Sequence, residues 1–244
     1  MTWDNRIVAA YQASDEKPDK KYSIGPTVVG LADPEGKEVL DLGCGSGFFT
    51  RRLIWAGAKR VIGLDNCPEK IRKAKIQPLP RLEYRLGDMF TDELPSVDVV
   101  TAPFTLNYAR NEDQLLLLLA RLYASLRAGG RLVSAIDLPE GRDLIRFGAR
   151  KTLLGPKQDG TLIQIELFNQ GLHFCTLPLA AHYFAPATIE RTLTQIGFIN
   201  LTWHKPIISP EGFKAFKNAP DFWKDYPDHP ELGYITAQKP PSKS

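Results

Sequence analysis

Glycines and acidic residues at fixed spacing form the strongest chemical signal in this sequence. The segment Asp41-Leu42-Gly43-Cys44-Gly45-Ser46-Gly47-Phe48 leads from a short apolar run through a GxGxG loop into a helical pattern. Glycines in such a loop permit a tight turn and let a ligand approach the backbone, while the free N–H groups at a helix start attract an anionic group. The loop therefore predicts a site for a nucleotide-like ligand.

This loop lacks the third glycine of the dinucleotide-binding fingerprint, which stands at the sixth position. That position is Phe48 when counted from Gly43, and Thr50 when counted from Gly45. Pyrophosphate binding is therefore disfavoured. A ligand with a carboxylate in place of the pyrophosphate needs an acceptor for its ammonium group, and Asp41 is placed to accept directly or through water. The methionine end of S-adenosylmethionine fits this description.

Two further acidic residues lie where the next two strands are expected to end. Asp65 comes 24 residues after Asp41, and a carboxylate there can accept hydrogen bonds from both hydroxyls of a ribose. Asp88, in Gly87-Asp88-Met89, can accept from the amino group of an adenine. The alternatives are structural, because Asp65 would only cap the helix that starts near Pro68, and Asp88 would only shape a turn.

Hydrophobic periodicity indicates the elements that hold these residues. Runs rich in β-branched residues alternate with amphipathic helical patterns, which is typical of βαβ units with parallel strands. The expected strands are 38–42, 60–65, 81–86, 97–102 and 131–137, and the expected helices are 46–56, 68–75 and 112–127. We expect Asn111 to cap the last of these helices and Gly129-Gly130 to stop it.

The pattern changes after residue 137. Two extended runs, 161–168 and 172–181, flank Asn169-Gln170-Gly171, whose glycine can adopt a positive φ. They predict an antiparallel hairpin, which we interpret as an insertion. A helix at 186–197, strands at 198–204 and 233–237, and a short helix around 210–217 complete the expected elements.

Composition limits the class of protein. The chain has 244 residues, 31 Lys and Arg against 28 Asp and Glu, and 43% hydrophobic residues, so it predicts a globular protein without the charge of a nucleic-acid binder. Its longest aliphatic run, Leu115 to Leu119, is far too short to span a bilayer. The first twenty residues lack the apolar stretch of a secretory signal. Cys44, Cys67 and Cys175 form no CxxC pair, so we expect reduced thiols and a cytoplasmic location.

With the glycine loop, Asp65 and Asp88 in this order, the sequence resembles the class I S-adenosylmethionine-dependent methyltransferases over roughly residues 20–238. The resemblance implies an α/β fold with a Rossmann-like, doubly wound seven-stranded sheet, mostly parallel with one antiparallel strand. A narrower resemblance is to the toxoflavin-biosynthesis type of small-molecule methyltransferase. It rests on Tyr11-Gln12 through Tyr22, on Phe104-Thr105-Leu106-Asn107-Tyr108-Ala109, and on Trp203-His204 with Ser209-Pro210-Glu211-Gly212.

The resemblance also implies roles for individual residues. It assigns Asp41, Gly43 and Gly45 to the methionine, Asp65 to the ribose, Asp88 and Met89 to the adenine, and Ala102 and Pro103 to the surroundings of the sulfonium. Cys44, Gly47, Phe48 and Asn66 are expected among the cofactor-binding residues, with Cys44 as a small filler of the loop rather than a nucleophile. Tyr11 and Tyr22 belong to an N-terminal segment that folds over the cofactor as a lid in such enzymes. Ordinary helix packing is the alternative for both tyrosines.

One segment departs from a neighbouring class of methyltransferases. Amino-methyltransferases that act on nucleic-acid bases or protein glutamine carry Asn/Asp-Pro-Pro-Tyr/Phe after the fourth strand, whereas this chain reads Thr101-Ala102-Pro103-Phe104. The departure argues against those substrates, and so does the near-neutral charge.

The expected chemistry is mainly one of positioning. A sulfonium already activates its methyl group, so the enzyme has to hold a nitrogen or oxygen in line behind the methyl carbon and exclude water. A general base is optional, and the candidates are Tyr108, His173 and His182, with packing as the alternative for each histidine. No cluster has metal-ligand spacing, so no metal is expected. Aromatic surface for a planar acceptor is expected from Phe104, Tyr108, Phe168, Phe174, Tyr183 and Phe184, several of which can instead be core residues.

These observations predict one methyltransferase domain over residues 1–244, with a lid at 1–35 and an inserted cap at 138–185. The predicted reaction is methyl transfer from S-adenosylmethionine to a nitrogen or oxygen of a small, aromatic or heterocyclic metabolite. The expected partner is that small acceptor, without nucleic acid or membrane, and the expected state is a monomer or homodimer. The alternatives are an NAD(P)-dependent oxidoreductase and a non-catalytic module that has kept only the cofactor site.

Overall fold

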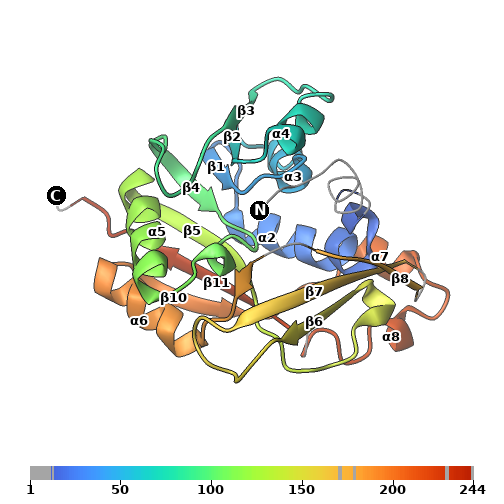
Figure 1. Cartoon of the computed structure of the whole chain (residues 1–244). Helices are drawn as coiled ribbons and strands as arrows, with labels where there is room; N and C mark the ends of the chain where they lie inside the picture. Colours follow the sequence, from blue (N-terminus) through green and yellow to red (C-terminus); the bar gives the residue numbers. More distant parts are fainter. Residues whose placement is uncertain (1–11, 13, 170–171, 178–179, 229–230, 243–244) are drawn as a thin grey trace.

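A mostly parallel β-sheet forms the centre of the computed structural model (Figure 1). The structure describes residue 12 and residues 14–169, 172–177, 180–228 and 231–242, and the side chains of residues 169–176 lie outside the described part. The strands of this central sheet are β1 (Glu38–Leu42), β2 (Arg60–Asp65), β3 (Leu82–Leu86), β4 (Val97–Thr101), β5 (Leu126–Asp137), β10 (Ile199–His204) and β11 (Leu232–Gln238).

The strand order is β10-β11-β5-β4-β1-β2-β3. Within the described residues, β11 runs antiparallel to β5 and β10, while the pairs from β5 to β3 are parallel. The five strands predicted before residue 138 are all present and parallel. The predicted fold, a doubly wound Rossmann-like sheet with one antiparallel strand, is therefore confirmed.

Helices cover both faces of the central sheet because successive strand residues point to opposite sides. Val39, Val61 and Val99 pack toward α2 (Gly25–Ala32) and α3 (Phe48–Trp55). Leu40 and Val100 pack toward α5 (Glu112–Ser125) and α6 (Pro186–Ile196), which lie together on one side of the sheet in Figure 1. The short helix α4 (Pro68–Ala74) packs near β2 and β3. The site is thus held on a sheet that is buried on both faces.

The end of α5 differs from the prediction. Asn111 caps the helix as expected, because its side chain accepts from the N–H of Gln114 at 3.0 Å. The helix stops at Ser125, however, and Gly129-Gly130 lie inside β5. Leu126 already has extended backbone and pairs with Val97, and a register shift follows before β5 pairs regularly with β4. The two glycines therefore belong to an irregular strand and do not end the helix.

A second sheet has its strands between residues 149 and 182 and is shown in yellow and gold in Figure 1. Its strands are β6 (Ala149–Leu153), β7 (Leu162–Asn169), β8 (Leu172–Thr176) and β9 (Ala181–His182). The antiparallel pairing of β7 with β8 confirms the predicted hairpin. The sequence did not predict β6, and the single run expected at 172–181 is divided into β8 and β9. Buried apolar residues such as Ile163, Ile165 and Leu177 give this sheet a core of its own.

Short elements connect the N-terminal segment to the C-terminal region. Residues 14–24 form the 3-10 helix η1 (Ser14–Glu16) and the π-helix η2 (Lys20–Ile24), which leads into α2. Near η2 lie α7 (Pro210–Lys214) and α8 (Ala219–Phe222), and the helix η4 (Ile145–Phe147) precedes β6. An aromatic cluster joins these parts, with Phe147 stacked on Trp223 at 5.4 Å between ring centroids.

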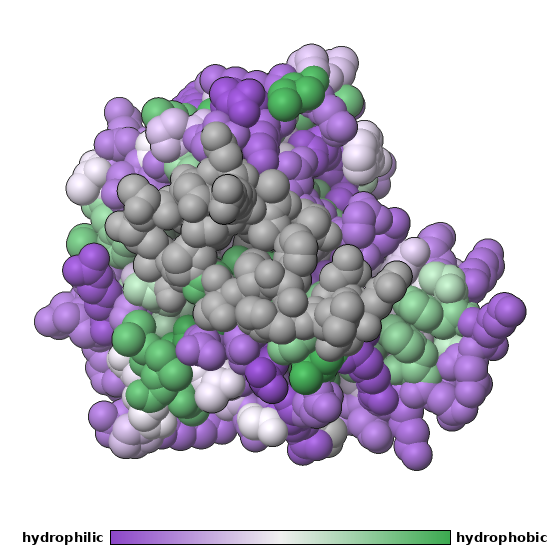
Figure 2. All heavy atoms as spheres, turned by 45° about the vertical axis from the view of Figure 1, so that its right-hand side comes forward, coloured by the Kyte–Doolittle hydropathy of each residue, from purple (hydrophilic) through white to green (hydrophobic). Residues whose placement is uncertain are grey.

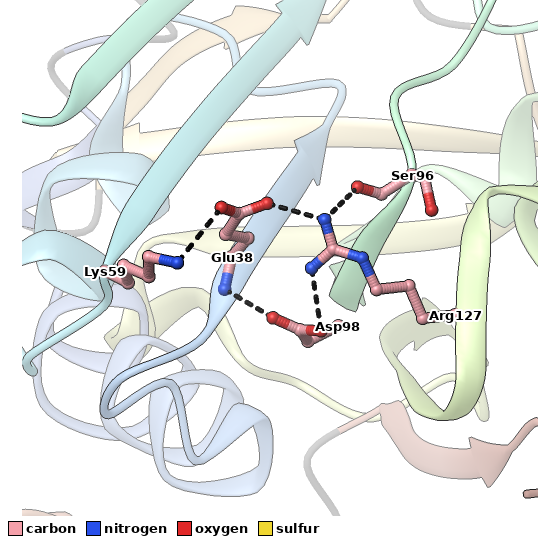
Figure 3. Close-up of polar contacts among 5 residues, drawn as sticks. All are labelled: Glu38, Lys59, Ser96, Asp98 and Arg127. Atoms are coloured by element: carbon pink, nitrogen blue, oxygen red, sulfur yellow. Dashed lines mark hydrogen bonds and ion pairs between the residues drawn. The ribbon is translucent and has the colours of Figure 1, made fainter.

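Charged residues tie the amino-terminal ends of the central strands together (Figure 3). The Arg127 guanidinium donates to Glu38 at 2.7 Å and to Asp98 at 2.8 Å, and it also binds the carbonyl of Ser96. Lys59 lies 3.6 Å from the Glu38 carboxylate. These side chains are partly exposed, so each contact contributes little to stability. This network lies at the amino-terminal ends of the strands, whereas the predicted site residues lie at their carboxyl ends.

Where Figure 2 colours the surface by hydropathy, it is mainly hydrophilic, and the hydrophobic residues occur in several separate places. Within the part of the chain that the structure describes, no helix is long and apolar enough to cross a membrane.

Candidate active site

Two cavities lie at the carboxyl ends of the central strands. The first, here called the strand-end cavity, encloses about 610 Å³ including its open mouth. Strands β2 and β3 follow β1 on one side of it, and β4 and β5 lie on its other side. The order of the strands therefore reverses at β1. In open α/β sheets, ligands bind in the crevice at such a point. The lining residues are Gly43, Leu64, Asp65, Asn66, Lys70, Gly87, Met89, Pro103, Phe104, Thr105 and Tyr108.

The glycine loop shapes one wall of this cavity. Gly43 has a φ of +66°, and a Cβ atom on it would lie 2.9 Å from Oγ1 of Thr105. Gly47 has a φ of +89°, and a Cβ atom there would clash with the Tyr84 hydroxyl. A larger residue at either position would combine backbone strain with a steric clash. Glycine is thus required at both positions for the loop to close against its neighbours.

Asp65 lies at the end of β2 with both carboxylate oxygens oriented by the backbone. Oδ2 accepts from the N–H of Gly45 at 2.9 Å, and Oδ1 accepts from the N–H of Cys67 at 2.8 Å. Each carboxylate oxygen can accept a further hydrogen bond. Beside it, burial lowers the pKa of Lys70, and the nearby Asp65 carboxylate opposes that shift. Asp65 is thus a pre-oriented acceptor pair on the cavity wall.

Asp41 is fully buried and does not belong to the lining of the strand-end cavity. Its carboxylate accepts from the hydroxyl of Thr50 at 2.7 Å and from that of Thr101 at 2.9 Å. Burial raises the pKa of Asp41 to about 6, although both hydroxyl hydrogen bonds oppose this shift. The two threonines fix Asp41 between β1, α3 and β4.

The other predicted cofactor residues fall into two groups. Asn66, Met89 and Pro103 line the strand-end cavity. Asp88 is half-buried outside the lining, and its Oδ1 accepts from the N–H of Phe90 at 2.7 Å, as in the turn that was its structural alternative. Ala102 is buried and lies outside the lining.

Cys44 and Phe48 are buried and lie outside the lining. Burial raises the pKa of the Cys44 thiol, which agrees with a filler rather than a nucleophile. The Arg52 guanidinium lies 3.6 Å from the ring centroid of Phe48 and covers it.

A second cavity, here called the insert cavity, lies between the N-terminal segment, the end of β5 and the inserted sheet. It encloses about 630 Å³ including its mouth. Most of its lining side chains are apolar, and the charged ones lie on two sides. The lining residues are Ser14, Lys17, Asp19, Lys20, Ile24, Phe104, Tyr108, Asp137, Ala149, Lys151, Ile165, Leu167, Leu177 and Ala181.

Phe104 and Tyr108 line both cavities. Phe104 has a φ of +61°, which is uncommon for a bulky residue, and its N–H donates to the carbonyl of Ala135 at 2.6 Å. Strained backbone of this kind persists where surrounding contacts enforce it, and it is frequent at functional sites. Tyr108 follows on the 3-10 helix η3 (Leu106–Tyr108). The two aromatic residues form the shared wall of the two cavities.

The three predicted bases, Tyr108, His173 and His182, differ in whether they line this shared wall. Tyr108 is part of it. His182 is buried on β9 outside both linings, and its Nδ1 has no hydrogen-bond partner among the described residues. Burial lowers the pKa of His182, and Arg110 adds to the effect. The side chain of His173 lies outside the described part of the structure.

The N-terminal tyrosines and the aromatic candidates are partly accounted for. Tyr11 lies outside the described residues. Tyr22 packs edge-on against Phe216, with ring centroids 6.2 Å apart, and lines neither cavity. Phe168, Tyr183 and Phe184 are buried outside both linings, and the side chain of Phe174 is not described. For Tyr22, packing was the alternative stated from the sequence.

Several lining residues were not among the sequence candidates. The charged residues of the insert cavity are Lys17, Asp19, Lys20, Asp137 and Lys151, and Lys70 lies beside Asp65 in the strand-end cavity. No motif contains these residues, and they meet through the fold of the inserted sheet against the N-terminal segment. Among the described residues, no group of three or more His, Cys, Asp or Glu side chains could hold a metal ion.

Part of this chain matches a known protein family. Residues 39–130 match the family described as "Methyltransferase domain". A trans-aconitate 2-methyltransferase of Variovorax paradoxus is 35% identical over 149 residues, which cover 59% of this chain and 52% of the relative. A tRNA U34 carboxymethyltransferase of a Shewanella species is 33% identical over 104 residues, covering 41% and 31% respectively. The chain therefore spans about half, or less, of the length of these curated relatives.

A solved structure shows the same fold over nearly the whole chain. It is an S-adenosylmethionine-dependent methyltransferase from Mesorhizobium loti, with a TM-score of 0.63 and 18% identity, covering 93% of this chain and 100% of that one. These similarities give a family match over residues 39–130 and a shared fold with the solved structure.

Proposed function

We propose that this chain transfers the methyl group of S-adenosylmethionine to a nitrogen or oxygen of a small, aromatic or heterocyclic metabolite. One observation carries the proposal: Phe104 and Tyr108 line both the strand-end cavity and the insert cavity. A donor in the first cavity and an acceptor in the second would meet across this wall. Such an arrangement suits a reaction whose main demand is the alignment of two reactants.

The strand-end cavity is the proposed cofactor site. Asp65 accepts the ribose hydroxyls, since its two oxygens are already oriented by backbone N–H groups. Met89 and Asn66 contact the adenosine, and Gly43, with Pro103, borders the methionine and sulfonium. Asp41 supports the glycine loop from behind through Thr50 and reaches the ammonium group at most through water.

The chain contributes alignment and exclusion of water to the reaction. The bound cofactor supplies a methyl group on a positively charged sulfur. Phe104 and Tyr108 hold the acceptor against this group, and the apolar side chains of the inserted sheet, such as Ile165 and Leu167, keep water away. Tyr108 is the catalytic candidate, because its side chain borders both reactants.

The broader assignments stay predictions. They are a single domain with a lid at 1–35 and a cap at 138–185, a cytoplasmic monomer or homodimer, and the resemblance to the toxoflavin-biosynthesis type of small-molecule methyltransferase. The relatives' names include both trans-aconitate and tRNA as substrates. We favour a small acceptor because the insert cavity is enclosed mostly by apolar side chains. The similarity to methyltransferases supports this function over a nicotinamide-dependent oxidoreductase.

Two measurements test the proposal. In a thermal-shift assay, S-adenosylhomocysteine should raise the melting temperature, and NADH should not. Methyl-labelled S-adenosylmethionine should then transfer label to at least one member of a panel of aromatic and heterocyclic amines, phenols and acids, with trans-aconitate included. Stabilisation by NADH alone would favour the oxidoreductase, and binding of S-adenosylhomocysteine without any transfer would favour the non-catalytic module.

A further inference from the structure

The insert cavity holds three lysines of unequal pairing. Lys151 lies 2.5 Å from Asp137, and Lys20 lies 2.6 Å from Asp15. Lys17 Nζ lies 3.6 Å from Asp19 Oδ1, and that same oxygen already accepts the N–H of Lys20 at 2.7 Å. Lys17 therefore has the weakest ion pair of the three, although only 14% of its side chain is exposed.

Gly148 leaves space for the Lys17 side chain. The backbone of Lys17 belongs to the turn between η1 and η2, where its N–H donates to the carbonyl of Ser14. Gly148, at the start of the inserted sheet, has a φ of +91°, and a Cβ atom on it would lie 2.7 Å from Cδ of Lys17. The aliphatic part of the Lys17 side chain thus packs against Gly148, and a side chain at position 148 would displace it. The ammonium group then lies at the cavity instead of in bulk water.

The electrostatics of this position favour the arrival of an anion. Burial lowers the pKa of Lys17, and the neighbouring Lys151 and Lys20 lower it further. Within the part of the chain that the structure describes, Asp19 is the one charged neighbour that raises this pKa. A buried charge is costly unless it is paired. An anionic group beside Lys17 would offset both the burial and the repulsion from the other two lysines.

The rest of the lining limits the body of such a ligand. Ile24, Ala149, Ile165 and Leu177 offer apolar surface, and the Phe104 ring lies on the side of the strand-end cavity. Resting on the proposed function, we propose that the methyl acceptor is a carboxylic acid with an apolar, planar body, and that Lys17 is the residue that recognises its carboxylate. Lys17 is a specificity residue, and the assignment leaves open which atom of the acceptor receives the methyl group.

Ligand binding tests this assignment without the natural acceptor. The protein, saturated with S-adenosylhomocysteine, is titrated with benzoate, 2-naphthoate and indole-3-carboxylate and with the primary amide of each acid. A charge-assisted hydrogen bond in a mostly buried site predicts that the acids bind at least about tenfold more tightly than their amides. The Lys17→Met variant should lose this preference, to a ratio below about twofold, and Lys17→Arg should keep it.

Lys21 provides a matched control. It lies four residues further along the same segment, pairs with Glu16 at 2.6 Å and lines neither cavity. Lys21→Met removes the same charge and should keep the acid preference. Thermal melts with and without S-adenosylhomocysteine show whether each variant is folded and binds the cofactor product.

The possible results separate this inference from the proposed function. If the wild-type protein binds S-adenosylhomocysteine but shows no acid preference, or if the preference survives in Lys17→Met, the role of Lys17 is wrong and the cofactor site stands. If S-adenosylhomocysteine does not bind, the proposed function fails first. An acid preference lost equally in Lys21→Met would reflect general charge and would also overturn the role of Lys17.

Discussion

Replacing Asp65 by asparagine should weaken both the fold and the cofactor site. The carboxylate accepts one backbone N–H on each oxygen, from Gly45 and from Cys67. An asparagine retains a single oxygen, so one buried N–H would face an amide NH₂ group, at a cost of about 1–3 kcal/mol in the free energy of unfolding. If Asp65 also accepts the ribose hydroxyls, the loss of a charged acceptor weakens binding by about 2–4 kcal/mol, or about 30- to 1,000-fold.

Isothermal titration with S-adenosylhomocysteine and urea unfolding measure these two quantities separately. Glu69→Gln is the matched control, because Glu69 lies in the first turn of the neighbouring helix α4, pairs with Arg72 at 2.7 Å and lines neither cavity. It removes the same charge and should change the affinity by less than about twofold. An Asp65→Asn variant that is folded and binds S-adenosylhomocysteine within about threefold of the wild type would refute the ribose assignment.

Three further predictions concern other parts of the structure. Burial raises the pKa of Asp41 from 3.8 to about 6; because this folded-state value lies above the unfolded one, ionisation costs about 3 kcal/mol of stability as the pH rises from about 4 to above 6. Urea unfolding should show this loss in the wild type and not in Asp41→Asn, and parallel pH profiles would contradict it. Arg127→Met breaks the contacts with Glu38 and Asp98 at the amino-terminal ends of the strands. It should lower the free energy of unfolding by about 1 kcal/mol or less and leave the affinity for S-adenosylhomocysteine unchanged. A weakened affinity in titration would count against the placement of the site. Asn107→Ala removes buried hydrogen bonds that join η3 to β5 and β9 and should cost about 2–4 kcal/mol in urea unfolding, whereas a cost below about 1 kcal/mol would show that these bonds contribute little.

Local patterns predicted the central sheet well. The run 60–65 is β2 with the same bounds, and Asn111 caps α5 as expected. Gly129-Gly130 misled because glycine also suits an irregular strand, and the early pairing of Leu126 with Val97 decided where α5 ends. Pairing across the sheet depends on residues distant in the sequence, which local pattern does not contain.

The sequence predicted those site residues that belong to a local motif and missed those that the fold brings together from distant segments. Asp65 ends strand β2, Gly43 and Met89 lie in loops that follow strands, and all three residues line the strand-end cavity. Lys17 and Lys151 come from segments more than 100 residues apart and meet only because the inserted sheet packs beside the N-terminal segment. A lone lysine next to Pro18 and Asp19 has no pattern that distinguishes it from a solvated charge.

The most direct test of the proposed reaction is methyl transfer itself. The protein is incubated with methyl-tritiated S-adenosylmethionine and, in separate reactions, with a small-molecule extract, total tRNA and a protein fraction. We predict label in the small-molecule fraction, carried by a methylated acid or by the methyl ester of an acid, together with release of S-adenosylhomocysteine. Label in tRNA or protein with none in the small molecules would contradict the account.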